Sequence, residues 1–182
     1  FDRPLDRSWR FFKEVMLQEK VIKGRPLAGI MHAFVFWGFL AFGLITLEHF
    51  ARGFDIILLS HSTHKAYSFI VIPFSILVII GIVHLAYRRF ITRPKALGKL
   101  SITSGIVATF ITLLMITYLI GETKLPATIW KANWWLHSIL ILAFLILVPR
   151  SKHLHLVLGP FNIFFKPFSQ PDHAPVNIDM DA

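Results

Sequence analysis

The chain has 182 residues, of which 55% are hydrophobic, and its mean hydropathy is +0.63. This composition indicates an integral membrane protein and excludes an ordinary soluble domain. The absence of Cys excludes disulfides and cysteine-ligated zinc or iron–sulfur clusters within this chain, which leaves histidine as its strong metal ligand. The net charge of +9 is explained by membrane topology, as described below, and we expect no nucleic-acid partner.

Residues 1–26 form the first predicted element, an amphipathic segment in the membrane interface. Apolar residues recur at helical spacing, among them Trp9, Phe12, Val15 and Met16, and charged residues interrupt them. This pattern is typical of a helix that lies along a membrane surface rather than crossing it. No signal-peptide pattern is present at the start.

Four apolar stretches follow, and each approaches or exceeds the length needed to cross a bilayer. They run from Leu27 to about Phe50, from Ala66 to about Tyr87, from Ser101 to Ile120 and from Ala132 to Val148. The predicted fold class is all-α: an integral membrane bundle of four spanning helices in residues 27–148. Interfacial segments are expected at both ends, in residues 1–26 and 149–182.

The basic residues predict the orientation of this bundle. Of the 19 Lys and Arg, seven lie in residues 1–26, five in residues 88–99 and three after Val148, and the other four are Arg52, Lys65, Lys124 and Lys131. Loops rich in Lys and Arg face the cytoplasm. We therefore predict a multi-pass protein of the cell (inner) membrane, surrounded by lipid, with both termini in the cytoplasm.

Histidines near the ends of the first and last spans form two predicted pairs. His32 and His49 are 17 residues apart, and His137 and His155 are 18 apart, which is five turns and about 27 Å of an unbroken helix. Because the two spans run in opposite directions, His32 should meet His155 near the inner side. His49 should likewise meet His137 near the outer side.

Paired imidazoles inside a membrane favour haem binding. Ionisable residues at such depths are functional candidates, and a haem that only transfers electrons takes two axial ligands from facing helices. We therefore predict two b-type haems, held by His32, His49, His137 and His155 as iron ligands. The HxxxH and HxxHH spacings of membrane di-iron sites do not occur in the sequence.

Other interpretations of these histidines remain open. A single His at the end of a span is more often hydrogen-bonded to a neighbouring group than bound to metal. Of the other histidines, we place His61 and His64 in the outer loop, His153 at the inner interface and His173 in a polar tail, and we assign no role to His84. The rival functions are a proton or metal transporter subunit with intramembrane His, and a haem-free membrane anchor.

Three segments carry a family resemblance: Ala28–Phe39, Gly81–Phe90 and Pro149–Asn162. They resemble the gamma (cytochrome b) subunit of respiratory nitrate reductase, and still more the membrane domain of heterodisulfide-reductase-like iron–sulfur oxidoreductases. The resemblance implies a five-span dihaem cytochrome that exchanges electrons between a quinone, such as menaquinone, and a cytoplasmic iron–sulfur protein or domain. It also implies His32, His137 and His155 as axial ligands.

The sequence departs from this family pattern at one expected ligand. The nitrate reductase pattern places a second first-span histidine where this chain has Phe42, and His49 lies seven residues further on, on about the same helix face and roughly 10 Å further out. An outer haem on His49, a single haem, and His64 as the outer ligand all remain possible. We expect the quinone near His64, Lys65 and Glu48, and we expect a trimmed or discontinuous chain, with one span of the family's five missing and the cluster domain elsewhere.

Overall fold

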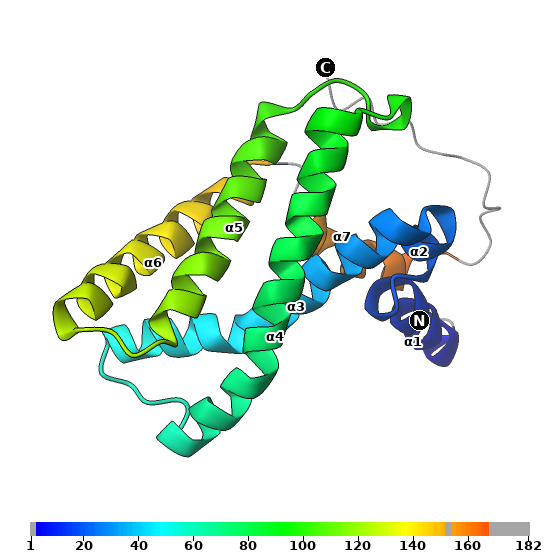
Figure 1. Ribbon diagram of the computed structural model, residues 1–182. Coiled ribbons are helices and arrows are strands. Elements are labelled where there is room, and N and C mark those ends of the chain that lie inside the picture. Colours follow the sequence, from blue (N-terminus) through cyan, green and yellow to red (C-terminus); the bar gives the residue numbers. More distant parts are fainter. Residues whose placement is uncertain (1–2, 152–153, 168–182) are drawn as a thin grey trace.

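The computed structural model of the chain describes residues 3–151 and 154–167. Helices account for all the regular structure of these residues, and no strand occurs among them. Four helices are long and apolar enough to cross a membrane: α3 (Pro26–Gly53), α4 (His61–Tyr87), α5 (Ile102–Gly121) and α6 (Ala127–Leu147). The predicted fold class, a membrane bundle with four spanning helices, is confirmed (Figure 1).

Short helical elements flank the four spans. The chain begins with α1 (Pro4–Phe11), a π-helical turn η1 (Phe12–Met16) and α2 (Glu19–Gly24). A second π-helical turn, η2 (Arg88–Thr92), and a 3₁₀ turn, η3 (Lys95–Leu97), follow α4. The last described helix is α7 (His155–Phe165). The apolar side chains of α1 include Leu5, which is 85% exposed, as expected of a helix that lies against lipid headgroups.

Helix α4 begins five residues earlier than predicted. Ser60 caps it, because the Ser60 hydroxyl accepts a hydrogen bond from the Thr63 amide at 3.2 Å. The prediction that His61 and His64 lie in a loop was therefore wrong, since both belong to the first turns of α4. Their side chains are held by a helix rather than by a flexible connection.

The last span is not continuous with the segment that carries His155. Helix α6 ends at Leu147, and the next helix starts at His155 itself. Pro149 accounts for this end, because proline has no backbone N–H to donate and disfavours helical geometry in the residue before it. The unbroken helix considered from the sequence, with His137 and His155 on one face, is therefore not formed, and the end of α6 lies one residue from the predicted Val148.

Consecutive spanning helices pack on one another, α3 on α4, α4 on α5 and α5 on α6. Helices α3 and α4 approach closely at Gly38, which faces Val78, and at Gly81, which faces the Met31 carbonyl. Small residues permit such contacts between membrane helices. The buried core lies between α3, α4, α5 and α6 and comprises Phe42, Ile45, Val71, Val78, Leu114, Met115, Tyr118 and Ile141.

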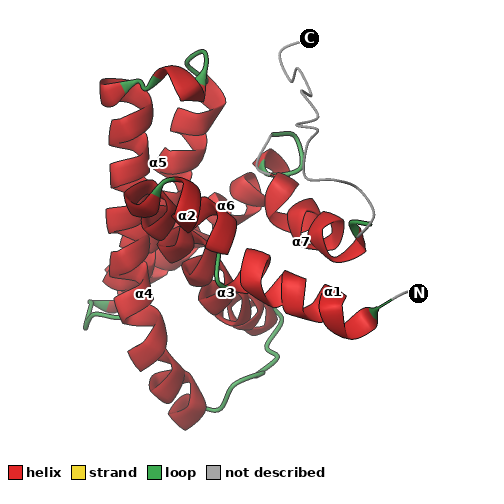
Figure 2. Ribbon diagram, turned by 90° about the vertical axis from the view of Figure 1, so that its right-hand side faces the viewer, coloured by secondary structure: helices red, strands yellow, loops and turns green. Residues whose placement is uncertain are grey.

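The N-terminal helix α1 holds the C-terminal helix α7. Arg7 is buried, and its guanidinium donates to the carbonyls of Phe164 at 3.1 Å and Lys166 at 3.2 Å. Arg10 donates to the same Lys166 carbonyl, and Phe11 meets Phe164 edge to face. Figure 2 shows α1 and α7 side by side, away from α4 and α5. These bonds satisfy carbonyls at the end of α7 that no further helical turn could reach.

Candidate functional site

The inner histidine pair is brought together by α3 and α7. His32 lies in α3 and His155 is the first residue of α7, and their ring centroids are 6.4 Å apart with the planes inclined by 27°. His32 Nδ1 is buried and has no hydrogen-bond partner. The pairing predicted from depth alone is therefore present in the structure, even though the helix between His137 and His155 is broken.

The inner pair fits an axial pair of haem ligands. A metal–imidazole bond is about 2.0–2.1 Å long, so the centroids of two imidazoles bound on opposite sides of one metal lie about 6 Å apart. The observed separation of 6.4 Å agrees with this value. A buried imidazole nitrogen without a partner is costly in an apolar protein, and an iron ligand bond or a hydrogen bond would relieve that cost.

The outer histidine pair is also brought together, by α3 and α6. The ring centroids of His49 and His137 are 5.3 Å apart, with the planes inclined by 70°. Each ring is hydrogen-bonded: His49 Nε2 lies 2.7 Å from the Ser138 hydroxyl oxygen, and His137 Nδ1 lies 2.7 Å from that of Thr117. His49 also stacks on Trp134, with centroids 4.8 Å apart.

This outer arrangement fits a haem only in part. An axial ligand needs a ring nitrogen that no protein group occupies. His137 meets this requirement, because its Nδ1 is bonded to Thr117 and its Nε2 remains available to bind iron. His49 does not, because its Nε2 is engaged by Ser138. The separation of 5.3 Å is also shorter than the about 6 Å expected of two axial imidazoles. As the residues stand, the inner pair has the ring separation expected of an axial pair, whereas the outer pair would require His49 to turn away from Ser138.

A cleft of about 660 Å³ opens beside the outer pair. Its size is in the range of sites that take small organic molecules. Aromatic and polar side chains share its wall, and they come from α3, α4, α5, α6 and the segments that follow α3 and α5: Glu48, His49, Arg52, Asp55, His61, His64, Thr117, Tyr118, Glu122, Trp130, Asn133, Trp134 and His137. His64 and Glu48 line the cleft as expected for the quinone site, whereas Lys65 does not.

Glu48 holds the loop that closes one side of this cleft. Its side chain is 1% exposed, and its carboxylate accepts hydrogen bonds from the backbone amides of Leu58 at 3.1 Å and Leu59 at 3.0 Å. Arg52 Nε lies 2.5 Å from the other carboxylate oxygen. Both carboxylate oxygens of Glu48 are thus hydrogen-bonded, as a buried carboxylate requires. Glu48 is therefore a structural residue of the cleft wall.

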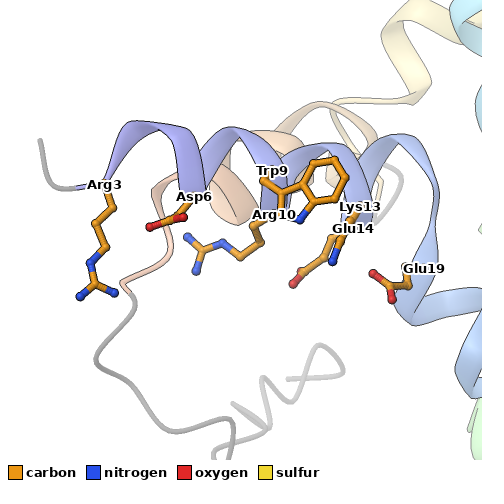
Figure 3. Close-up of a pocket in the computed structure, with 7 residues that line it drawn as sticks. All are labelled: Arg3, Asp6, Trp9, Arg10, Lys13, Glu14 and Glu19. Carbon is orange, nitrogen blue, oxygen red and sulfur yellow. The ribbon is translucent and has the colours of Figure 1, made fainter.

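A second cavity, of about 440 Å³, lies on the N-terminal helices, away from the histidine pairs. Figure 3 shows its lining: Arg3, Asp6, Trp9, Arg10, Lys13, Glu14 and Glu19. Basic and acidic residues are equally represented, and the hydrogen bond from Lys23 holds the pKa of the Glu19 carboxyl below its usual value. Such a charged surface suits the headgroup zone, and its lining contains no imidazole that could bind a haem iron.

Several residues of the site were not predicted from the sequence. They are three polar residues of otherwise apolar spans. Thr117 bonds His137, Ser138 bonds His49, and Asn133 donates to the backbone carbonyl of Thr117. A signal existed in their position, because Ser138 follows His137 directly and Asn133 precedes it by one turn. His153 and His173 lie outside the described residues, and no cluster of three or more potential metal ligands occurs in residues 3–151 and 154–167.

Two curated proteins are similar to this chain. The protein named probable iron-sulfur-binding oxidoreductase FadF, from Bacillus subtilis, is 30% identical over 193 residues, which cover 88% of this chain and 27% of the relative. EtfAB:quinone oxidoreductase from Syntrophomonas wolfei is 25% identical over 210 residues, which cover 91% of this chain and 28% of the relative. The chain therefore spans a little over a quarter of the length of these two proteins. No protein-family model matches the sequence, and no solved structure matches it significantly.

Proposed function

We propose that this chain is the membrane part of a quinone-linked oxidoreductase, a b-type cytochrome that transfers electrons between a quinone in the bilayer and an iron–sulfur protein or domain in the cytoplasm. The observation that carries the proposal is the inner pair, in which the ring centroids of His32 and His155 lie 6.4 Å apart, close to the spacing of axial ligands. The names of the two relatives support the redox partners, since one refers to iron–sulfur binding and the other to quinone.

His32 and His155 would hold the inner haem. A haem iron with two imidazole ligands changes between ferric and ferrous states and so carries one electron at a time. Helix α3 supplies His32 from a span that packs on α4, and α1 holds the helix that supplies His155. The protein thus fixes both ligands from separate elements.

A second haem on His49 and His137 stays a prediction. His137 already offers Nε2, while His49 would have to exchange its bond to Ser138 for an iron ligand bond. The single-haem alternative is therefore a distinct outcome of the experiment below.

The outer cleft is the proposed quinone site. It adjoins the outer pair, its wall contains Trp130 and Tyr118 for contact with an aromatic ring, and His64 can exchange hydrogen bonds with quinone oxygens. Its position in the spanning bundle suits a substrate that reaches the protein through lipid.

The test is the visible spectrum of the purified full chain before and after reduction with dithionite. We expect the sharp α band of a six-coordinate b-type haem in the unaltered protein. His32→Ala and His155→Ala should each remove one haem per chain, because each leaves the inner iron one ligand short. His84→Ala, which changes another histidine of a spanning helix, should retain the full haem content.

The outcomes separate the proposed function from its rivals. A protein without a b-type band would overturn the cytochrome and favour the anchor or the transporter. Loss of all haem in His32→Ala would indicate a single haem, whereas loss of half would indicate two. Unchanged haem content in both His32→Ala and His155→Ala would show that the inner pair is not the ligand pair.

A further inference from the structure

The hydrogen bond between α5 and His137 determines which ring nitrogen carries a hydrogen. Thr117 Oγ1 lies 2.7 Å from His137 Nδ1 and 2.8 Å from the Leu113 carbonyl oxygen. A carbonyl can only accept, so we assign the single hydrogen of the hydroxyl to the bond with Leu113. With this assignment the Thr117 oxygen accepts from the imidazole, which places the hydrogen of His137 on Nδ1 and its lone pair on Nε2.

The same reasoning gives His49 the opposite tautomer. Ser138 Oγ lies 2.7 Å from His49 Nε2 and 2.8 Å from the Trp134 carbonyl oxygen. We assign the hydroxyl hydrogen to the bond with Trp134, so that the Ser138 oxygen accepts from Nε2. This assignment places the hydrogen of His49 on Nε2 and its lone pair on Nδ1. The two neighbouring rings are held in different protonation patterns by two hydroxyl groups.

Thr117 is itself fixed in place. Its side chain is 4% exposed, and its backbone carbonyl accepts a hydrogen bond from Asn133 Nδ2 at 2.9 Å. Asn133 lies one turn before His137 on the same side of α6, so α6 contacts Thr117 through two side chains at once. These two bonds fix the register of α5 against α6, and with it the orientation of the His137 ring.

We propose that Thr117 and Ser138 control how the outer pair binds iron. Thr117 is a positioning residue that orients His137 so that its Nε2 can bind iron. Ser138 has the opposite effect, because its hydrogen bond occupies Nε2 of His49. The inference rests on the proposed function, since haem iron is the ligand concerned. Hydrogen bonds to the far nitrogen of a ligating histidine orient the ring and strengthen it as a ligand. Removing the two hydroxyls should therefore have opposite effects.

The experiment measures haem content in a His32→Ala background, where the inner haem is removed and any remaining haem belongs to the outer pair. Thr117→Val should weaken haem retention about tenfold, the lower end of the range for such outer partners. Ser138→Ala should increase the low-spin haem content, because His49 no longer has to give up a hydrogen bond. Thr117→Ser keeps the hydroxyl and should restore retention. Thr112→Val is the matched control, because the Thr112 hydroxyl bonds only the Ala108 carbonyl of its own helix.

A second measurement reads the tautomers directly, through ¹⁵N resonances of histidine-labelled full chain in lipid nanodiscs under reducing conditions. We expect His137 to be protonated at Nδ1 in the unaltered protein and in Thr112→Val. In Thr117→Val we expect a different distribution of the two tautomers. Equal behaviour of Thr117→Val and Thr112→Val in both measurements would overturn the inference. An unaltered protein without haem would overturn the proposed function, on which the inference rests, whereas haem that is present in the unaltered protein and disappears completely in His32→Ala would overturn the inference alone.

Discussion

At the scale of single residues, the polar side chains inside this bundle are joined to one another in short chains of hydrogen bonds. Glu48, Thr117 and Ser138 each bond two or more partners, and each is almost fully buried. His32 Nδ1 is buried without a hydrogen-bond partner, and so are the hydroxyl oxygens of Ser68 and Tyr118. Each of these atoms bears the cost of a buried polar group that makes no hydrogen bond.

The first residue-scale prediction concerns Glu48. Glu48→Ala should lower the free energy of unfolding by about 1–3 kcal/mol, because the amides of Leu58 and Leu59 lose their acceptor. Thermal unfolding in detergent, followed by circular dichroism, measures the change. Glu19→Ala is the matched control, because Glu19 pairs with Lys23 at the same i,i+4 spacing on an exposed surface and should have little effect. Equal destabilisation by the two substitutions would contradict the structural role of Glu48.

The sequence was sufficient to predict four of the site residues and insufficient for those that bond to them. His32, His49, His137 and His155 could be paired from spacing and direction, because an imidazole in an apolar span is conspicuous. Thr117 and Ser138 could not be recognised, because a hydroxyl in a membrane helix usually bonds its own backbone. Only the tertiary contact of α5 with α6, and of α3 with α6, shows that these hydroxyls also reach a histidine.

At the scale of elements, the bundle depends on a close backbone contact between α3 and α4. A Cβ added at Gly81 would lie 2.6 Å from the Met31 carbonyl oxygen, and that oxygen belongs to a backbone that cannot move alone. The predicted spans located these helices within a few residues. The starts were less accurate, because α4 and α6 each begin five residues before the predicted Ala66 and Ala132, and a hydropathy pattern does not detect a cap such as Ser60.

The element-scale prediction tests that contact. Gly81→Ala should destabilise the bundle by about 1–3 kcal/mol, the usual effect of overpacking. Gly43→Ala, in the neighbouring helix, adds the same methyl group where no atom lies within 4 Å, and should be neutral or slightly stabilising. Unfolding midpoints in one detergent compare the two variants directly. If Gly81→Ala were as stable as Gly43→Ala, the packing of α3 on α4 would have to differ from that described.

At the scale of the whole molecule, the four apolar helices are those of a protein that crosses a membrane, and the distribution of Lys and Arg predicts its orientation. Many apolar side chains face outward along the spans, such as Phe69, which is 73% exposed, and Ile139, which is 59% exposed. In a bilayer these side chains contact lipid. The orientation itself stays a prediction of the positive-inside rule.

Accessibility of single cysteines tests this orientation. The chain has no native Cys, so Lys95→Cys and Lys124→Cys each introduce one reactive thiol. Both positions are exposed, one in the connection between α4 and α5 and the other between α5 and α6. In oriented vesicles an impermeant maleimide should label Lys95→Cys only from the cytoplasmic side and Lys124→Cys only from the outside. Labelling of both from one side would refute the topology.

The break between α6 and α7 has a mechanical consequence for the two histidine pairs. In one continuous helix, His137 and His155 would belong to a single rigid rod, and any displacement of one would be transmitted to the other. With the rod interrupted after Leu147, His155 moves with α7 and with the arginines of α1, whereas His137 moves with α5 and α6. The two pairs are still joined through α3, which carries both His32 and His49, but His155 can adjust its position against His32 without displacing His137.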